Sequence, residues 1–513
     1  YHQTVESALD KLAPLKTKTM VQKSRPQWFS PELLQERKKL RSLERKWLKS
    51  RLHVDKDLFV QARTQYNISL NNAKTEFYRT RIIESNNEKT LFKIVDEISG
   101  NKKLVANTLP DCDIELLPEM FANFFVDKIS KIRSNLDVMN ENETVLVIDE
   151  DFLPSETVFD CFELMSVDSV TKLVCSMNTK SCSLDPVPTR IVKDCIDLWA
   201  PVLTSIVNTS FTSGKFPDNC KSAVVRPLIK KHDLERKKKK NYRPVSNCSF
   251  LDKFLERCAF VHLNEYLNTN SLYGKFQSAY RQGHGTETAL LKVHNDIMLA
   301  LDSKMDVFFI LLDLSAAFDT IDHSILLQRL KSRFHIRGNV ISWIEAFLCG
   351  RTQRISLGSM VSNEQPLTFG VPQGSVLGPI LFSLYVTPLE DIIIRHGCKT
   401  VIFADDTQIY ITCNNADNSV KIETCIDEIR QWMKTNFLAL NDSKSEFINF
   451  SSKFNRTRSD NDVSQIRVGD SVINSASVVR NLGVYFDCEG TMDKQLLNIL
   501  PTFVKMHLTH CGE

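Results

Sequence analysis

The sequence has no long apolar run and no paired cysteine motif. No stretch approaches the roughly 18 consecutive apolar residues that a membrane-spanning helix needs, so we do not expect an integral membrane protein. The 14 cysteines are scattered singly without C-x-x-C spacing, which argues against a zinc knuckle and favours reduced thiols in a cytoplasmic or nuclear protein. The N-terminus has no apolar signal region, so we do not expect secretion. It also lacks an initiator Met, and we expect a chain that starts within a larger product.

Composition and length are those of an ordinary folded protein. Hydrophobic residues make up 42% and charged residues 25% of the 513 residues, which excludes a disordered or fibrous chain. At roughly 150 residues per domain, the length allows roughly three or four units that can each bury a core. The sequence has no internal repeat, and the basic run Arg236–Lys240 is its one biased segment.

The small net charge of +3 conceals an uneven distribution. Between Lys16 and Lys89 there are 18 basic and 8 acidic side chains, whereas residues 101–180 carry 7 basic and 15 acidic ones. Ser30 followed by Pro31 is typical of a helix start, and apolar residues recur at helical spacing through the basic block. A basic helix favours contact with a phosphate backbone, and a merely solvated surface is the alternative. The candidate nucleic-acid-binding residues are Arg37, Lys38, Arg41, Arg45 and Lys49.

Three segments in the second half carry polar groups in unusual settings. Six apolar residues, 307–312, predict a buried strand that ends at Asp313, where a carboxylate is costly unless it pairs or binds a cation. Two β-type runs flank Asp405 and Asp406, which predicts a tight hairpin with adjacent carboxylates at its tip. Residues 369–379 form a Gly/Pro loop that leads into a helix, where backbone N–H groups could face an anion.

Each segment alone has an ordinary explanation, but together they predict a metal site. An Asp can cap a helix, Asp-Asp is common in turns, and a Gly/Pro loop is usually only a connection. Carboxylates that lie close together repel one another, and Mg²⁺ relieves this repulsion because it prefers oxygen ligands and substrate phosphates. Two such ions about 4 Å apart serve phosphoryl transfer. No nucleophile elbow, Walker loop or dinucleotide fingerprint competes, so the pattern favours nucleotidyl transfer over hydrolysis.

In their order, these segments resemble the reverse transcriptases of non-LTR (LINE, jockey-like) retrotransposons over about residues 181–486. The Asp313, Gln373–Gly374 and Asp405–Asp406 segments match the three main palm motifs. Further matches lie at residues 223–231, 241–246, 276–288, 440–446 and 481–486.

The resemblance implies an α+β fold with right-hand polymerase fingers and palm, preceded by a basic helical N-terminal region. The palm would be a split β-α-β sheet with helices on one side, and an apolar helical face from Ile422 to Met433 would pack in its core. The expected domains are a basic helical connector (1–100), an acidic linker with short helices (101–165), fingers (166–300), a palm with the catalytic carboxylates (301–455), and the end of the palm with a truncated thumb or tail (456–513).

The resemblance also implies roles for individual residues. Asp313, Asp405 and Asp406 would be catalytic and would hold two Mg²⁺ ions, with Mn²⁺ as a substitute and the Leu314 carbonyl as a further ligand. Phe318 would exclude a 2′-hydroxyl and so select deoxynucleotides. Arg243 and Lys230 would grip the triphosphate, Gln373 and Gly374 would line the nucleotide and template pocket, and Lys444 would protonate the leaving pyrophosphate. In the alternative reading, Arg243 and Lys444 are surface charges and Phe318 is core packing.

We therefore predict an RNA-directed DNA polymerase that adds deoxynucleotides to a primer 3′-OH on an RNA template by two-metal catalysis. Its partners would be an RNA template, a DNA or RNA primer and deoxynucleotides, with no membrane partner and no protein partner that can be inferred. Neither the endonuclease nor the full thumb of such elements is found, so we expect a fragment or degraded copy. A catalytically inactive nucleic-acid-binding remnant is the alternative, and a splicing maturase is disfavoured because no maturase region is present.

Overall fold

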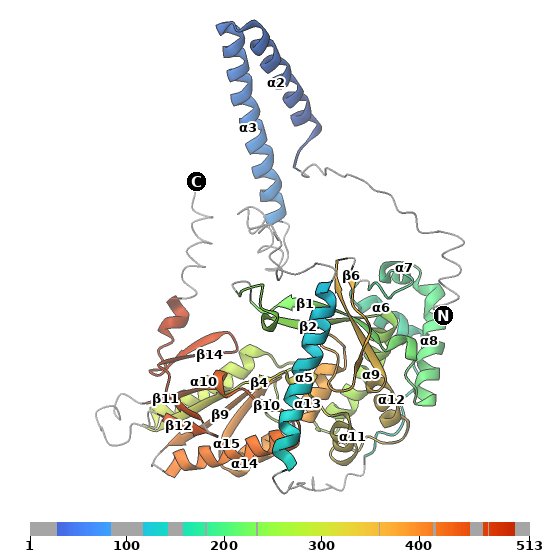
Figure 1. The fold of residues 1–513 in the computed structure, drawn as a ribbon, viewed down its shortest axis with the longest axis vertical. Helices are drawn as coiled ribbons and strands as arrows, with labels where there is room; N and C mark the ends of the chain where they lie inside the picture. The colour runs from blue at the N-terminus through green and yellow to red at the C-terminus, as the bar shows by residue number, and fades with distance from the viewer. Residues whose placement is uncertain are drawn as a thin grey trace. The chain divides into compact units, whose positions relative to one another are not determined.

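This computed structural model describes residues 28–83, 116–141, 157–179, 182–231, 234–358, 360–413, 417–451, 465–469 and 471–497. They belong to two compact units, one within residues 3–110 and one within residues 111–513 (Figure 1). Among the described residues, no helix has the length and apolar character needed to cross a bilayer. The cysteines in the described part of the chain are free thiols, as the scattered spacing predicts.

The first unit is a helical hairpin of α2 (Pro31–Ser50) and α3 (His53–Ile83). The side chain of Ser30 caps the start of α2 by accepting a backbone hydrogen bond, which confirms the predicted helix start. The two helices are held together by stacking of Trp47 on Phe59, whose ring centroids are 5.5 Å apart.

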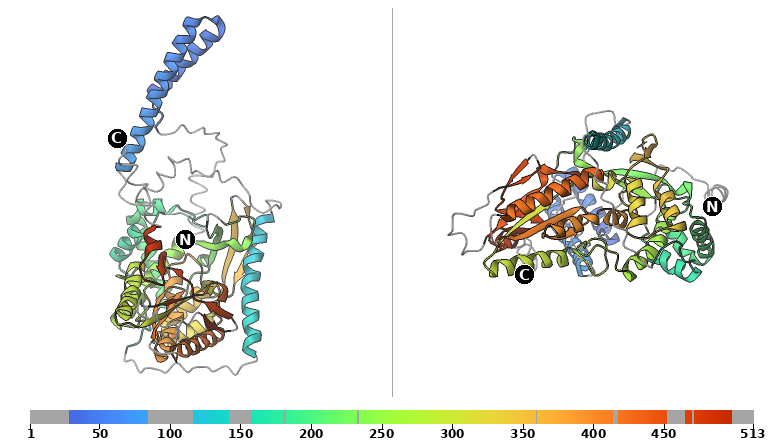
Figure 2. Two further views of the ribbon diagram at one scale, coloured as in Figure 1. Left: turned by 90° about the vertical axis from the view of Figure 1, so that its left-hand side faces the viewer. Right: turned by 90° about the horizontal axis from the view of Figure 1, so that it is seen from below.

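In its described residues, the second unit contains two larger sheets, three two-stranded ladders and the helices around them (Figures 1 and 2). Its helices are α5 (Leu117–Glu141), α6 (Val167–Ser176), α7 (Thr189–Asp194), α8 (Ile196–Ser213), α9 (Phe250–Thr269), α10 (Thr286–Asp302), α11 (His323–Ser332), α12 (Gly338–Leu348), α13 (Gly378–Tyr385), α14 (Pro388–Arg395) and α15 (Asp417–Thr435). Its strands are β1 (Ser222–Ile229), β2 (Tyr242–Cys248), β3 (Asp306–Leu312), β4 (Leu314–Ser315), β5 (Arg351–Leu357), β6 (Met360–Val361), β7 (Gln365–Leu367), β8 (Lys399–Phe403), β9 (Asp406–Cys413), β10 (Ala439–Leu440), β11 (Glu446–Phe450), β12 (Gln465–Val468), β13 (Ser471–Asn474), β14 (Val478–Asn481) and β15 (Val484–Asp487).

The sheet expected for the fingers has the strand order β2-β1-β5-β6, with β7 also paired to β5. β1 and β2 are antiparallel neighbours, and their register sets Leu228 opposite Arg243. The two strands predicted at 223–231 and 241–246 are therefore present and paired. Their pairing places Arg243 on β2 opposite Leu228, two residues before Lys230, which follows β1 directly.

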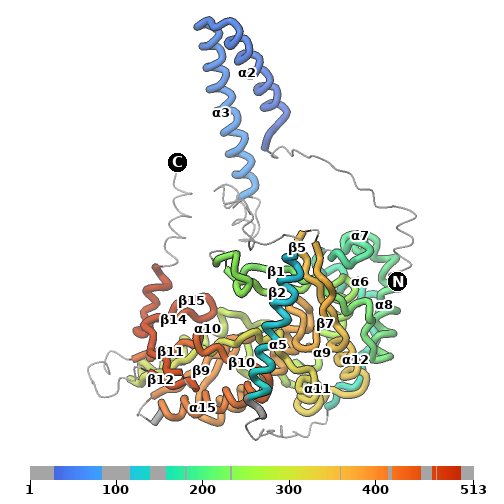
Figure 3. Tube along the Cα trace, in the orientation of Figure 1, coloured from blue at the N-terminus to red at the C-terminus, as the bar shows by residue number. Residues whose placement is uncertain are grey.

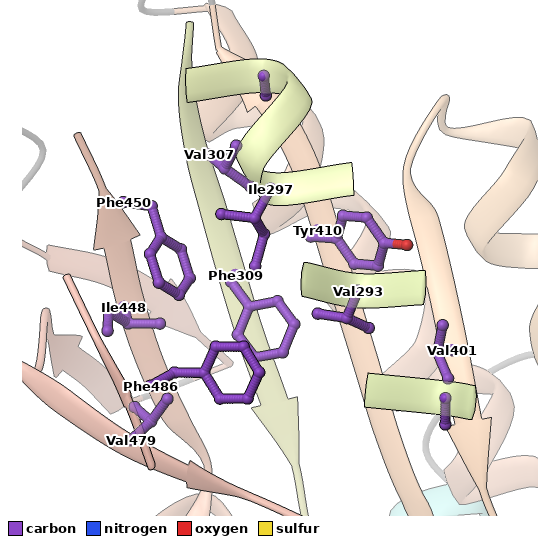
Figure 4. Packing of buried hydrophobic residues seen from close by; sticks show 12 residues of the cluster. Val293, Ile297, Val307, Phe309, Val401, Tyr410, Ile448, Phe450, Val479 and Phe486 are labelled. Carbon is purple, nitrogen blue, oxygen red and sulfur yellow. The ribbon is translucent and has the colours of Figure 1, made fainter. Parts of the chain in front are cut away.

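The sheet expected for the palm has the order β11-β3-β9-β8 and is antiparallel throughout. One face packs on α10, with Phe309 of β3 at the centre of an apolar cluster that includes Phe450 and Phe486 (Figure 4). The hairpin of β14 and β15 supplies Phe486 and lies beside β11 (Figure 3).

Helices cover both faces of the palm sheet, whereas the sequence led us to expect helices on one side. The reason lies in β3, because its alternate residues Phe308 and Ile310 are also buried and point away from the α10 face. α14 and α15 contact β8 and β9, and the predicted apolar face of α15 from Ile422 to Met433 is buried as expected.

The region expected to be an acidic linker with short helices contains one 25-residue helix, α5. Its buried residues include Leu117, Phe121, Phe125 and Leu136, at spacings that fall on one helical face. α5 contacts β5 and α15, so it touches both the fingers sheet and the palm (Figure 2).

Candidate active site

Three carboxylates meet at one end of the palm sheet. The β3–β9 ladder ends with the residues next to Asp313 and Asp406, so its continued register sets these two residues opposite each other. β8 and β9 are joined by a two-residue turn of Ala404 and Asp405, which confirms the predicted tight hairpin. The site therefore takes one carboxylate from the end of a central strand and two from a hairpin tip.

The hairpin turn is held by Gln277, a residue to which the sequence assigned no role. Ala404 has a φ of 58°, in the left-handed region that alanine rarely adopts. The buried Gln277 side chain accepts hydrogen bonds through Oε1 from the backbone N–H of Ala404 (3.1 Å) and of Ala279 (2.9 Å). The backbone beside Gln277 also pairs with Ile402 of β8. These contacts offset the strain of the turn and fix the position of Asp405.

The carboxylates of the hairpin hold their protons more tightly than ordinary aspartates. Burial raises the pKa of Asp405, and the charge of Asp313 adds to this effect while Lys444 opposes it. Desolvation by the surrounding protein, followed by the charges of Asp405 and Asp313, raises the pKa of Asp406 to about 6. A cluster of repelling carboxylates with oxygen as the common donor atom fits a hard divalent cation.

Asp313 is paired within the protein. Its Oδ2 atom accepts hydrogen bonds from Nζ of Lys444 and from Nδ2 of Asn441, each over 3.0 Å. The backbone N–H of Asn441 also donates to the Asp313 carbonyl over 2.9 Å. Lys444 and Asn441 thus neutralise and orient Asp313, and Asn441 is a site residue that sequence reasoning placed in a motif without a role.

Leu314 and Phe318 lie on the segment that follows Asp313. Leu314 belongs to β4, which pairs with β10 and so holds the backbone beside Asp313. The Phe318 ring is stacked on Phe382 of α13, with centroids 4.6 Å apart and an interplanar angle of 25°. The Phe318 ring is half-buried, because Phe382 covers one of its faces while part of the ring stays accessible to solvent.

Gln373 and Gly374 dock on the fingers strand β2. The backbone N–H of Ser246 donates to the Gln373 carbonyl over 2.7 Å. Gly374 has a φ of 114°, and a Cβ atom there would lie 2.6 Å from the Ser246 carbonyl oxygen, so a larger residue does not fit without a backbone shift. Nε2 of Gln373 donates to both carboxylate oxygens of Asp319.

Lys230 and Arg243 lie on the finger hairpin. Nζ of Lys230 donates to the Lys240 carbonyl over 2.9 Å, and Arg243 is exposed on β2. Burial lowers the pKa of Lys230, and the nearby charges of Lys128, Lys444 and Arg243 lower it further. The charge of Asp313 acts in the opposite direction and raises the pKa of Lys230.

A cavity of about 370 Å³ opens beside the carboxylates. Asp313, Asp406 and Lys444 line one part of it, and Arg480 and Asn481 of β14 line another. The sequence placed 481–486 in a motif that closes the palm, and it gave no role to Arg480.

The predicted nucleic-acid-binding residues lie on α2 in the first unit, and they are distant in sequence from the three carboxylates. All five are exposed: Arg37, Lys38, Arg41, Arg45 and Lys49. Arg41 forms an ion pair with Glu44 over 2.7 Å, and Lys46 of the same helix pairs with Asp55 of α3 over 3.0 Å.

With this geometry in place, comparison with known proteins identifies the fold. The family described as "Reverse transcriptase (RNA-dependent DNA polymerase)" matches residues 229–486. This chain belongs to that family. The matched residues extend from the end of β1 to β15 and contain all three carboxylates. The α+β fold of fingers and palm is therefore that of a reverse transcriptase domain, as the motifs predict.

Its relatives among curated proteins are polymerases of non-LTR retrotransposons. The RNA-directed DNA polymerase from mobile element jockey of Drosophila melanogaster is 27% identical over 347 residues, which cover 66% of this chain and 37% of that protein. The probable RNA-directed DNA polymerase from transposon X-element of the same species is 25% identical over 487 residues, 91% of this chain and 51% of that protein. The chain thus spans from about a third to half of the length of these relatives. The predicted resemblance to the non-LTR group of reverse transcriptases is confirmed.

Proposed function

We propose that this chain is an RNA-directed DNA polymerase that adds deoxynucleotides to a primer 3′-OH on an RNA template. The observation that carries the proposal is the meeting of Asp313, Asp405 and Asp406 at one end of the palm sheet, within a reverse transcriptase domain. Its relatives named as RNA-directed DNA polymerases support the same activity.

The carboxylates would hold two Mg²⁺ ions, with Mn²⁺ as a substitute. The donor set supports this assignment, because it consists of carboxylate oxygens, and burial followed by the charges of Asp405 and Asp313 raises the pKa of Asp406. The Leu314 carbonyl, next to Asp313, is a further candidate ligand. Bound ions would neutralise phosphate charge and activate the primer hydroxyl. Lys444 would then exchange its partner Asp313 for the leaving pyrophosphate and serve as a proton donor.

The incoming deoxynucleotide would lie between the fingers and the palm. Arg243 and Lys230 would bind its triphosphate, where a guanidinium can form two parallel hydrogen bonds. The ring of Phe318, held by Phe382, would lie under the sugar and exclude a 2′-hydroxyl. Gln373 and Gly374 would line the pocket from the loop that docks on β2.

The template RNA and a DNA or RNA primer would be bound by the fingers, the palm and the basic face of α2. Each phosphate neutralised by a residue such as Arg41 or Arg45 releases a counterion, so binding would weaken steeply with salt. The division into connector, linker, fingers, palm and truncated thumb stays a prediction.

Primer extension tests the proposal. The purified chain would be incubated with Mg²⁺, a DNA primer annealed to an RNA template, and deoxynucleotides. We expect incorporation by the wild type and its loss in Asp405→Ala. Asp302→Ala, which removes an exposed carboxylate at the end of α10, is the matched control and should retain activity.

The outcome of this experiment distinguishes an active polymerase from a catalytically inactive, nucleic-acid-binding remnant. If wild-type chain binds primer–template but incorporates nothing, the proposal is wrong and the chain is a nucleic-acid-binding remnant. If Asp405→Ala retains activity, the carboxylates are not the site of the chemistry.

A further inference from the structure

Helix α5 lies outside the residues that match the family, yet it is fixed to both parts of the polymerase domain. Near its N-terminal end, the buried Phe121 packs edge-on against Tyr242 of β2, with ring centroids 5.0 Å apart. The Glu119 carboxylate accepts a hydrogen bond from the backbone N–H of Asn363, between β6 and β7, over 2.9 Å. These contacts hold the helix on the fingers, and further along it Arg133, which is 8% exposed, binds to the palm.

The polar contacts of Arg133 are with the palm turn at residues 316–322. Its guanidinium donates to Oδ2 of Asp322 over 2.8 Å and to the carbonyl of Thr320 over 3.4 Å. The other oxygen of Asp322, Oδ1, accepts hydrogen bonds from two backbone N–H groups in the first turn of α11 and so caps that helix. Because the cap uses the other oxygen, α11 does not need Arg133 in order to begin at this position. The guanidinium instead fixes where the 316–322 turn lies.

Arg133 also lies over two aromatic rings from other parts of the palm. Its Cζ atom is 4.1 Å from the ring centroid of Phe369 and 3.6 Å from that of Phe437, distances at which a guanidinium is attracted to the face of a ring. Phe437 has a φ of 53°, a left-handed conformation that disfavours residues other than glycine, and the contact with Arg133 offsets this cost. Phe369 begins the 369–379 loop, and Phe437 precedes Asn441 by four residues. Arg133 therefore contacts three separate segments that each carry a residue of the candidate site.

Two of these segments meet at Phe318. The Phe318 carbonyl accepts a hydrogen bond from the backbone N–H of Val371 over 2.9 Å, and the Ile321 carbonyl accepts one from Gly370 over 2.8 Å. Gly370 has a φ of 76°, and a Cβ atom there would lie 2.6 Å from the Phe318 carbonyl oxygen, so the two backbones are in close contact. Because Arg133 contacts the turn on one side of this pairing and the loop on the other, it holds the two together.

We propose that Arg133 is a positioning residue for sugar selection, because it fixes Phe318 relative to Asp313. A ring excludes a 2′-hydroxyl only while its distance from the bound sugar is fixed, and the carboxylates that hold the reacting phosphate determine where the sugar lies. Arg133 contacts the turn that bears Phe318, and through Phe437 it contacts the segment in which Asn441 orients Asp313. The inference rests on the proposed polymerase function and adds to it a specificity-determining residue from a helix that precedes the family match.

Competition between deoxynucleotides and ribonucleotides in primer extension tests the proposal. Arg133→Met keeps an apolar stem and removes the guanidinium, and we expect it to reduce discrimination against ribonucleotides about fivefold. Arg133→Lys can still pair with Asp322 but lacks the planar group that lies over the rings, so it should recover part of the discrimination. Lys131→Met removes an exposed charge from the same helix and should behave as wild type. Leu203→Ala, which removes a fully buried side chain of α8, should lower the melting temperature and leave discrimination unchanged.

Amide hydrogen exchange separates this inference from the polymerase proposal, because it needs no substrate. We expect Arg133→Met to speed exchange of the Gly370 and Val371 amides about tenfold through local opening, and Lys131→Met to leave it at the wild-type rate. Unchanged exchange of these two amides in Arg133→Met would overturn the inference, and so would an active Arg133→Met enzyme with wild-type discrimination. If the wild type incorporates no nucleotide, the proposed function is wrong, and the exchange rates alone decide whether Arg133 positions the turn.

Discussion

The amide nitrogen of Gln373 lies 2.9 Å and 3.0 Å from the two carboxylate oxygens of Asp319. Because both acceptors belong to one carboxylate, the amide must present its nitrogen to Asp319, and its carbonyl oxygen is the end left for another donor. Asp319 therefore positions Gln373, and through it the loop that would line the nucleotide pocket.

Removal of the Asp319 carboxylate should loosen this loop. We expect Asp319→Ala to lower kcat/KM for deoxynucleotides about tenfold, because Gln373 loses a charge-assisted partner. Asp319→Asn retains one acceptor oxygen and should fall between the wild type and Asp319→Ala. Burial raises the pKa of Asp319 to about 6, so KM of the wild type should rise as pH falls through that value. Steady-state primer extension at pH 5.5 to 8 measures the loss of kcat/KM in the variants and the pH dependence of KM in the wild type. If Asp319→Asn had the same pH profile as the wild type, titration of Asp319 would not be the cause of the pH dependence.

Glu256 of α9 should control the stability of the same loop. Its Oε2 atom accepts hydrogen bonds from the backbone N–H of Val376 (2.7 Å) and Leu377 (2.8 Å), and the side chain is fully buried. Burial and the adjacent Asp252 raise its pKa to about 8, so it carries a proton at neutral pH. Glu256→Gln should therefore be close to wild type, whereas Glu256→Leu should lose about 3 kcal/mol of unfolding free energy because two buried N–H groups lose their acceptor.

Denaturant unfolding of these two variants tests the role of Glu256. The sign of the pH effect follows from its raised pKa. The folded state holds this proton more tightly than the unfolded state, so the stability that it contributes is present at low pH and is lost as pH rises toward about 8. Glu256→Gln should remove this part of the pH dependence. Equal stabilities of the Gln and Leu variants would mean that the two hydrogen bonds contribute nothing.

The sequence predicts those parts of the site that depend on local pattern. The apolar run 307–312 forms a strand because it is buried on both faces, and Asp405 and Asp406 occupy a hairpin because β-type runs flank them. The finger strands and the core face of α15 follow from the same kind of signal.

The residues that sequence reasoning missed act over long separations. Gln277 supports a turn 127 positions away, and Asn441 orients Asp313 over 128 positions. No periodicity or spacing in one chain reveals such a pair, because the contact exists only once two distant segments have packed. α5 was missed for a related reason, since the acidic composition around it concealed an apolar face that needs both the fingers and the palm as partners.

Phe318 should determine the choice of sugar. Its ring is held in place by the stack on Phe382, so the ring would clash with the 2′-hydroxyl of a ribose bound above it. We expect Phe318→Ala to reduce discrimination against ribonucleotides at least about tenfold, with a smaller change in the use of deoxynucleotides. Competition between deoxynucleotide and ribonucleotide substrates measures the ratio. Phe382→Leu, which removes the support and keeps Phe318, should show the same change to a lesser degree, and an unchanged ratio in both variants would leave Phe318 as core packing.

We expect the Asp406 carboxylate to lower the unfolding free energy of the metal-free chain and to bind Mg²⁺. Its pKa is raised to about 6, so the metal-free folded state holds this proton more tightly than the unfolded chain, and the carboxylate destabilises the fold progressively as pH rises through about 4 to 6. Asp406→Asn should therefore stabilise the metal-free chain at pH 7.5, by about 1 kcal/mol once screening at this solvent-accessible position is included. Added Mg²⁺ should raise the melting temperature of the wild type and have little effect on Asp406→Asn, because bound cations relieve the repulsion that the substitution has already removed. Thermal unfolding with and without Mg²⁺ measures both changes. A less stable Asp406→Asn variant would show that the Asp406 carboxylate does not destabilise the metal-free fold. An equal response of the two proteins to Mg²⁺ would show that Asp406 is not a metal ligand.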